Sequence, residues 1–225
     1  MTSPEFEPEK DNNSLPLFDR LYDERSAAPS SSESESESES ESDPGSSSSL
    51  PSHPLAKRIK IATGDITHLD VDAVVAAANQ ELCGGAGVDG AIHRAAGPEL
   101  VEASMAQAPC PAGRARITPA FNMHVEHVIH AVGPIFYDLD VDSIKLASAY
   151  SASLQLAAEN RINRIAFPCI STGVYGFPKL EACEIAFQTA IQWLQENEFP
   201  QQVTFCCYEP VDADLYEQRY DDFFG

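Results

Sequence analysis

The chain has 225 residues, with 35 acidic and 14 basic side chains and a formal net charge of −21 at pH 7. This length allows one large domain or two small ones. The acidic balance disfavours nucleic acid as a partner, because binding it needs a Lys- and Arg-rich surface. No apolar run approaches the ~18 residues of a membrane span, and the N-terminus lacks the character of a signal or transit peptide. We therefore expect a soluble intracellular protein, cytoplasmic or nuclear, with no membrane partner.

The first 55 residues are dominated by Pro, Ser and Glu and include the run SSSESESESESESD from Ser30 to Asp43. Such a segment buries too little apolar surface to offset its ordering entropy. We therefore predict a disordered tail over residues 1–55 and a folded domain over residues 56–225. The folded part is acidic in its own right, because the tail accounts for −10 of the net charge and the rest for −11. The serine run is either a solvated acidic spacer or a substrate for an acid-directed kinase.

After the tail, short apolar runs alternate with amphipathic segments. The expected strands are 58–62, 72–78, 115–121, 127–132, 164–170 and 202–208. The expected helices are 87–96, 97–108, 143–160, 179–197 and 212–224. Near-continuous apolar strands indicate a sheet buried on both faces, and the alternation predicts an α/β fold, a three-layer α/β/α sandwich. The third and fourth strands are close in sequence and should pair antiparallel, so the sheet should be mixed.

The cysteines and histidines do not suggest a metal site. The six cysteines form no C-x-x-C pair, and several lie in apolar runs such as FPCI and TFCCY, where free cysteine packs as a small hydrophobe. The six histidines add no recognisable ligand spacing. We expect a reducing compartment, no metal and no cofactor.

A buried strand, a glycine-rich loop and a helix follow one another twice in the chain. GGAGVDG follows the strand that ends near Asn79, and STGVYGFP follows the strand that ends at Ile170. Glycine lets backbone amides approach an anion, and the start of a helix favours negative charge. Two such loops at neighbouring strand ends would suit a diphosphate, although each loop alone could serve only to reverse the chain. Neither loop is a Walker motif or a G-x-G-x-x-G motif, so NTP hydrolysis and dinucleotide redox chemistry lack their usual signature.

The run TGDITHLDVDAVVAAANQELCGGAGVDGAIHRAAGPEL resembles the opening of a macrodomain of the MacroD type, a branch of ADP-ribose-binding hydrolases. CPAGRARIT, VIHAVGP, IAFPCISTGVYGFP and VTFCCYEPVDADLYE match the family in the same order, so the resemblance covers about residues 58–220. It implies a monomeric three-layer macrodomain that binds ADP-ribose.

The resemblance also implies how ADP-ribose is held. Asp65 would accept a hydrogen bond from the adenine amino group, the Ile66 backbone N–H would help to fix the ring, and Tyr208 would stack near it. The two glycine-rich loops would wrap the diphosphate with backbone amides. Their residues are Gly84, Gly85, Ala86, Gly87 and Val88 in the first loop, and Ser171, Thr172, Gly173, Val174, Tyr175 and Gly176 in the second.

The implied catalytic residues are Asn79, Asp89 and His93. Asn79 would orient the distal ribose, Asp89 would position or activate the attacking water, and His93, one helical turn later, could orient Asp89. Tyr175 would pack against the distal ribose. A phosphate of the substrate is an alternative means of placing the water.

Some of these residues also have ordinary structural interpretations. Asp65 could cap a turn, His93 could be a structural helix residue, and His130 in HVIHAV is expected to be a satisfied core or strand-face histidine. Two positions depart from the family pattern: Ala76 replaces the first asparagine of N-A-A-N, and Ala86 replaces a glycine. Ala76 implies a lost internal hydrogen bond, and Ala86 would be strained if its φ were positive.

These features together predict an enzyme that removes mono-ADP-ribose from acidic side chains of proteins and deacetylates O-acetyl-ADP-ribose. The alternative is a module that reads ADP-ribose on proteins without turnover. A pure reader has no need of a water-activating set, so Asn79, Asp89 and His93 favour the enzyme. Hydrolysis of serine-linked or poly-ADP-ribose needs other catalytic residues and is less favoured.

Overall fold

A computed structural model of the chain describes residues 53–225. The predicted disordered tail and its kinase sites therefore lie outside the described residues, apart from residues 53–55. These three belong to ordered structure, because the short 3-10 helix η3 (Pro54–Arg58) begins there and buries Leu55. The folded part thus starts a few residues earlier than the predicted boundary at residue 56.

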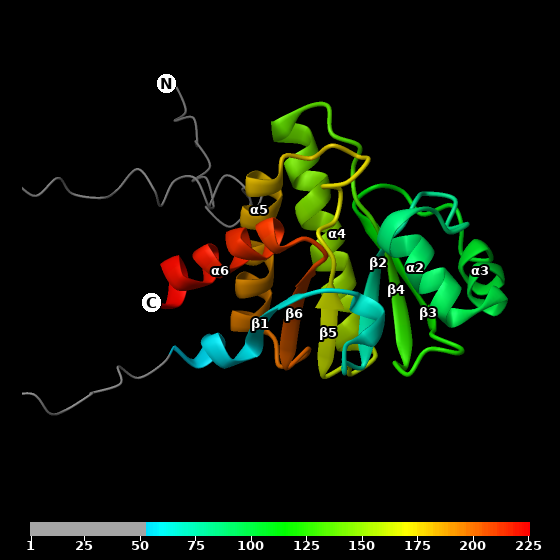
Figure 1. Cartoon of the computed structure of the whole chain (residues 1–225), viewed down its shortest axis with the longest axis horizontal. Helices are drawn as coiled ribbons and strands as arrows, with labels where there is room; N and C mark the ends of the chain where they lie inside the picture. Colours follow the sequence, from blue (N-terminus) through cyan, green and yellow to red (C-terminus); the bar gives the residue numbers. More distant parts are fainter. Residues whose placement is uncertain (1–52) are drawn as a thin grey trace, which may run out of the picture. The chain divides into compact units, whose positions relative to one another are not determined.

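The described residues form one six-stranded sheet, in the order β1-β6-β5-β2-β4-β3. Its strands are β1 (Ile59–Thr63), β2 (Ala73–Ala77), β3 (Arg114–Pro119), β4 (His127–Val132), β5 (Arg164–Phe167) and β6 (Gln202–Cys207). All neighbours pair parallel except β3 and β4, which pair antiparallel with Ile117 opposite Ile129. The six predicted strands and the mixed sheet are confirmed (Figure 1).

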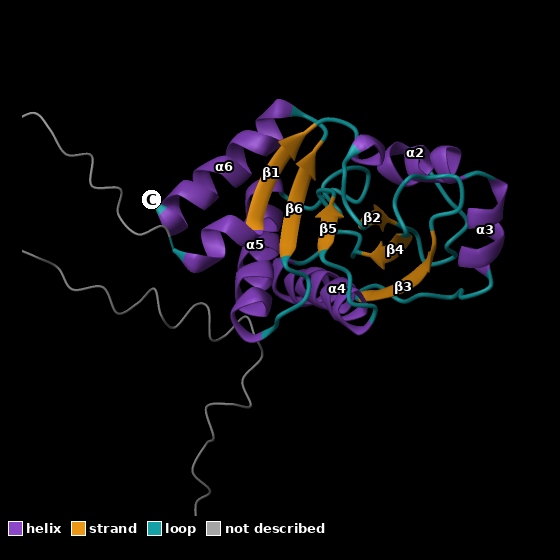
Figure 2. Ribbon diagram, turned by 90° about the horizontal axis from the view of Figure 1, so that it is seen from below, coloured by secondary structure: helices purple, strands orange, loops and turns teal. Residues whose placement is uncertain are grey.

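Helices cover both faces of this sheet (Figure 2). They are α2 (Gly87–Ala96), α3 (Pro98–Met105), α4 (Leu139–Glu159), α5 (Lys179–Glu196) and α6 (Pro210–Phe224). The helices α4, α5 and α6 pack into one apolar cluster, and α2 and α3 into another on the opposite face. The predicted three-layer α/β/α fold is therefore confirmed. Within residues 53–225, no helix has the length and apolar character needed to cross a membrane.

Successive side chains of each strand point to opposite faces of the sheet, so the apolar core is divided into two layers. In β2, Val75 belongs to the cluster beneath α4 and α5, whereas Val74 and Ala76 belong to the cluster beneath α2. All three are fully buried. Each strand face therefore supplies one layer of apolar contact, as expected for a sheet covered on both sides.

The carboxyl ends of the five parallel strands, β1, β6, β5, β2 and β4, lie at one edge of the sheet. The segments that follow β1, β6, β5 and β2 begin with Gly64, Tyr208, Pro168 and Ala78. The Gly64 N–H donates to the Cys207 carbonyl (2.9 Å), which ties the segments after β1 and β6 together. In open α/β sheets ligands bind at this edge, so it is where the functional residues should gather.

At the opposite end of the sheet, Arg58 fastens the start of the fold to the turn between α5 and β6. Its guanidinium donates to five carbonyl oxygens at 2.6–3.2 Å, those of Leu194, Asn197, Glu198, Pro200 and Gln201. These carbonyls belong to the last turn of α5 and to the segment that joins α5 to β6. One planar group with five fixed donors can satisfy such a set, and a lysine cannot.

We expect Arg58→Ala to lower the free energy of unfolding by about 2–3 kcal/mol, because it leaves several partly buried carbonyls without their charged donor. Chemical denaturation measures this change, with Lys57→Ala as the control because Lys57 is exposed on the same 3-10 helix. Equal stability of the two variants would show that the guanidinium is not needed.

Candidate active site

Asp89 lies in the first turn of α2 and is 3% exposed. Burial raises the pKa of this carboxyl from 3.8 to about 6. The helix begins at Gly87 (φ +60°), after Ala86 in an extended conformation (φ −96°). Ala86 therefore carries no left-handed strain, and the strain considered from the sequence at this position does not arise.

The loop between β2 and α2 is held by the Asn79 side chain. The Asn79 amide donates to the Gly84 carbonyl (2.8 Å), and its oxygen accepts from the Cys83 N–H (3.3 Å). A Cβ atom on Gly85 would lie 3.3 Å from Asp89 Oδ2 and 3.9 Å from Asn79 Nδ2. The amide and the carboxylate thus both lie beside the Gly85 backbone, and the two predicted catalytic residues come together.

The same loop passes closely over α2. A Cβ atom on Gly90 would clash with the Gly85 carbonyl oxygen, so this approach needs glycine at that position of the helix. Gly85, Ala86 and Gly87 remain at least partly exposed. Their backbone is therefore open to a ligand at the start of a helix, where negative charge is favoured.

The second glycine-rich loop follows β5, the neighbour of β2. Ser171 has a positive φ (+67°) and packs so closely on Gly133 that a side chain there would clash with it. The Gly176 N–H donates to the Gly173 carbonyl (2.9 Å), which closes a tight turn. Gly173, Val174 and Gly176 are exposed, whereas Ser171 is buried and Thr172 half-buried. This loop and the first one thus flank the end of the β2–β5 pair, as predicted.

Tyr175 lies in the second loop, within electrostatic range of Glu81 and Asp89. It is half-buried, and its pKa is raised by burial and by the nearby charges of Glu81 and Asp89. The structure therefore brings Tyr175, Asp89 and Asn79 to one place, where the family resemblance implies a distal ribose.

The residues predicted to hold adenine lie at the ends of β1 and β6. Asp65 caps the 3-10 helix η4 (Ile66–His68), accepting from the Thr67 N–H (2.9 Å) and hydroxyl (2.7 Å), and these bonds lower its pKa. The turn-cap interpretation of Asp65 is thus correct, and its carboxylate remains partly accessible. Ile66 is buried, whereas Tyr208 is 80% exposed and offers an open stacking surface.

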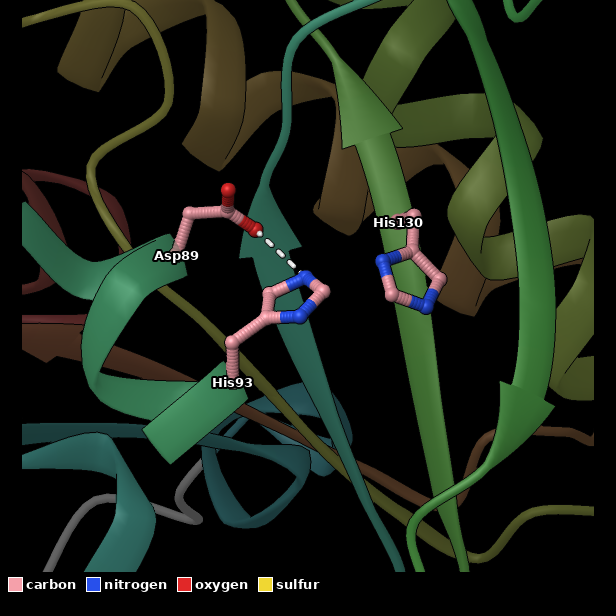
Figure 3. Close-up of side chains that lie close together, drawn as sticks. All are labelled: Asp89, His93 and His130. Carbon is pink, nitrogen blue, oxygen red and sulfur yellow. Dashed lines mark ion pairs between the residues drawn. The ribbon is translucent and has the colours of Figure 1, made fainter. Parts of the chain in front are cut away.

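His93 and His130 both face Asp89 (Figure 3). His93 Nε2 lies 3.6 Å from Asp89 Oδ1, one turn along α2, and the centroids of the two imidazole rings are 5.9 Å apart. Potential ligand atoms of Asp89, His93 and His130 lie within 4.8 Å of one another. Local spacing did not indicate such a cluster, because His130 is on β4, 37 residues beyond His93.

The expectation for His130 was only half right. The residue is fully buried, and its Nε2 pairs with the Thr118 hydroxyl (3.0 Å), but Nδ1 has no hydrogen-bond partner among residues 53–225. The strand pattern contained the signal: alternation in HVIHAV puts Val128 and His130 on the face that carries α2. Ala76 is opposite His130 in the β2–β4 register, so no polar side chain reaches His130 from that position of β2.

Comparison with known proteins identifies the family of this fold. The family model described as "Macro domain" matches residues 75–186. The chain is 48% identical over 169 residues to a protein of Escherichia fergusonii named O-acetyl-ADP-ribose deacetylase, covering 73% of this chain and 96% of that one. The chain belongs to the macrodomain family. It is also 44% identical to the human protein named ADP-ribose glycohydrolase MACROD2, over 76% of this chain and 41% of the human one.

Solved macrodomains have the same fold. A mutant macrodomain of Oceanobacillus iheyensis with ADPR superimposes with a TM-score of 0.70 at 40% identity, over 73% of this chain and 92% of that one. The Trypanosoma brucei macrodomain in complex with ADP-ribose gives 0.70 at 36% identity, over 76% and 72%. The family resemblance seen in the sequence is therefore confirmed.

In this macrodomain we expect Gly90→Ala to lower the free energy of unfolding by about 1–3 kcal/mol, because the new methyl group must displace the Gly85 backbone. Gly173→Ala is the matched control: a Cβ there meets nothing within 4 Å, and its φ is not positive. Thermal unfolding of both variants measures the difference. A Gly90→Ala variant as stable as Gly173→Ala would contradict the close approach.

Proposed function

We propose that this macrodomain is a hydrolase that removes mono-ADP-ribose from acidic side chains of proteins and deacetylates O-acetyl-ADP-ribose. The observation that carries this proposal is Asp89, a buried carboxyl with a pKa of about 6 that lies beside the Asn79 amide and between two glycine-rich loops. A module that only binds ADP-ribose has no need of a base tuned in this way.

Binding of the diphosphate would depend on the backbone rather than on basic side chains. The chain carries a net charge of −21, and the loops beside β2 and β5 contain no lysine or arginine between Gln80 and Asp89 or between Ser171 and Pro178. The exposed backbone N–H groups of residues 85–87 and the N-terminus of α2 carry partial positive charge. They can therefore bind a diphosphate without a lysine or arginine side chain. The second loop would close over the other side of the diphosphate.

The chemistry needs a held water, a base and a fixed ribose. Water attacks the ester linkage at the distal ribose while Asp89 accepts one of its protons. The bond between the acyl carbon and the ribose oxygen then breaks, and Asp89 returns the proton to the ribose oxygen, so that the products are free ADP-ribose and the released carboxylic acid. Asn79 can orient a ribose hydroxyl, because an amide both donates and accepts hydrogen bonds. A carboxyl with a pKa near 6 is ionised at neutral pH and is a stronger base than an ordinary aspartate.

The names of the relatives support this reaction class. Proteins named O-acetyl-ADP-ribose deacetylase are 46–49% identical to the chain, and the human relative is named as a glycohydrolase of ADP-ribose. Both names describe hydrolysis next to an ADP-ribose unit. Transfer of the activity to this chain rests on the presence of Asn79, Asp89 and His93 in one place.

We expect Asp89→Asn to reduce release of ADP-ribose from a glutamate-linked mono-ADP-ribosylated protein by at least ~100-fold, because a general base contributes this much or more. ADP-ribose affinity, measured by calorimetry, should stay within about threefold, since Asn is isosteric. Glu99→Gln, an exposed acidic residue at the start of α3, serves as the control. Wild-type protein that binds ADP-ribose but releases none would make it a reader, and full activity in Asp89→Asn would favour placement of the water by a substrate phosphate.

The pH dependence of kcat should report the ionisation of the Asp89 carboxyl. A base acts when ionised, so kcat should rise with pH through about 6 and level off above pH ~7, following the raised pKa of Asp89. Steady-state rates between about pH 5 and 8, corrected for spontaneous ester hydrolysis, measure this limb. A rate that is flat across this range would exclude a titrating carboxyl with this pKa.

A further inference from the structure

The proposed reaction assigns no role to His130, yet its surroundings are unusual for a core residue. The side chain lies on β4, the strand next to the sheet edge, and is fully buried between Thr118 of β3 and His93 of α2. One ring nitrogen is satisfied by the Thr118 hydroxyl, and the other is not satisfied by any residue that the structure describes. An unsatisfied buried polar atom is destabilising unless something completes its hydrogen bonding.

Two other polar atoms near His130 Nδ1 are also buried and left unsatisfied by the described residues. They are Asp89 Oδ1 and His93 Nε2. Each is buried, and within residues 53–225 none of the three has a hydrogen-bond partner. They come from α2 and β4 and converge between the two elements (Figure 3). The 3.6 Å separation of Asp89 Oδ1 and His93 Nε2 is too long for a direct hydrogen bond.

We propose that His130 is a positioning residue: with one enclosed water it completes a buried chain, Thr118–His130–His93–Asp89, that orients the Asp89 carboxylate. This inference rests on the proposed hydrolase function. His130 does not touch the substrate in this arrangement; it acts through the water and through His93.

The spacing favours a water over a metal ion. Three polar atoms around one water lie about 2.8 Å from it and therefore up to about 4.6 Å from one another. Three ligands of zinc at about 2.1 Å would be about 3.4 Å apart. The 3.6 Å separation of Asp89 Oδ1 and His93 Nε2 is compatible with both arrangements, and the limit of 4.8 Å among all three atoms is closer to the first. The second would require the three side chains to draw closer together.

The charge states allow such a chain at neutral pH. Burial lowers the pKa of His93 and lowers that of His130 to about 4, so both rings are neutral and each carries one N–H. A neutral ring can donate from one nitrogen while the other accepts, and the Thr118 hydroxyl can serve either tautomer. The water can then donate to the Asp89 carboxylate and accept from an imidazole.

Other titratable groups near this chain come from each element that packs on it. Arg94 extends from α2, Tyr175 from the loop after β5, and Arg116 stands opposite His130 in the β3–β4 register. From β2 the facing residue is Ala76, which does not titrate. Within the part of the chain that the structure describes, Asp89 is paired with neither arginine, so the carboxylate depends on hydrogen bonds for its orientation.

The first test compares His130→Leu with His130→Gln in the full chain, since Gln retains an amide at the site and Leu does not. In His130→Leu we expect kcat to fall by at least ~10-fold with KM within about threefold, and the acid limb of the pH profile to move to higher pH, because the carboxylate loses a hydrogen bond that favours its charged form. His130→Gln should recover part of both effects, and Thr118→Val should show a smaller change in the same direction. A KM that rises as kcat falls, with an unmoved pH limb, would make His130 merely structural.

The second test needs no turnover. Titration of the Asp89 carboxyl by ¹³C NMR, assigned by its loss in Asp89→Asn, should show a pKa about 0.5 units or more higher in His130→Leu than in wild type. Thermal unfolding of His130→Leu and Asp89→Asn checks that each variant is folded. An unchanged Asp89 pKa would overturn the inference even if wild type hydrolyses its substrate, and a raised pKa in a protein without turnover would reject only the function.

Elemental analysis showing one tightly held transition metal per chain would replace the water by a metal site and overturn the proposal.

Discussion

Strand β2 lies between β5 and β4 and runs parallel to both, and this pairing determines where the functional groups of the protein lie. Parallel neighbours end at the same edge of the sheet, so the loops after β2 and β5 meet there although they are far apart in the chain. The same pairing puts His130 of β4 beside Ala76 and beneath α2. Asn79, Asp89, Tyr175 and His130 are thus brought together by one set of backbone hydrogen bonds.

The site also depends on how tightly its backbone is packed. Gly90 allows the loop after β2 to lie directly on α2, and Gly133 allows Ser171 to adopt its left-handed conformation at the end of β5. Both glycines lie outside the loops they support. Binding of a diphosphate by backbone amides, as proposed above, needs these amides in fixed positions, because neither glycine-rich loop carries a flexible lysine to adjust the fit. The close packing at Gly90 and Gly133, behind the two loops, keeps the backbone amides in these positions.

Much of the fold was predictable from the sequence, because it depends on local patterns. The six apolar runs, the antiparallel pair β3–β4 and the helix starting at Gly87 follow from burial and periodicity, and the loops follow from glycine and the family motifs. The conformation of Ala86 was not predictable, because its extended φ depends on how the loop crosses α2. His130 was placed in the core but its open nitrogen was missed, since only the tertiary structure brings it to His93. The 3-10 helix that begins at Pro54 was missed because its contacts are with residues near 194–201, far along the chain.

Burial of Asp89 has a consequence for the whole molecule. Its pKa is about 6 in the folded protein, against an ordinary value of 3.8 for the unfolded chain, so between these values folding takes up a proton. Protonation favours the folded form, and this contribution is lost as the pH rises through 6. At neutral pH the resulting loss of stability is roughly 2–3 kcal/mol, since each unit of pKa shift is worth about 1.4 kcal/mol. The carboxylate that we propose as the base is therefore ionised in the conditions in which it destabilises the fold most. A bound ligand that offset this loss would stabilise the protein most strongly in those same conditions.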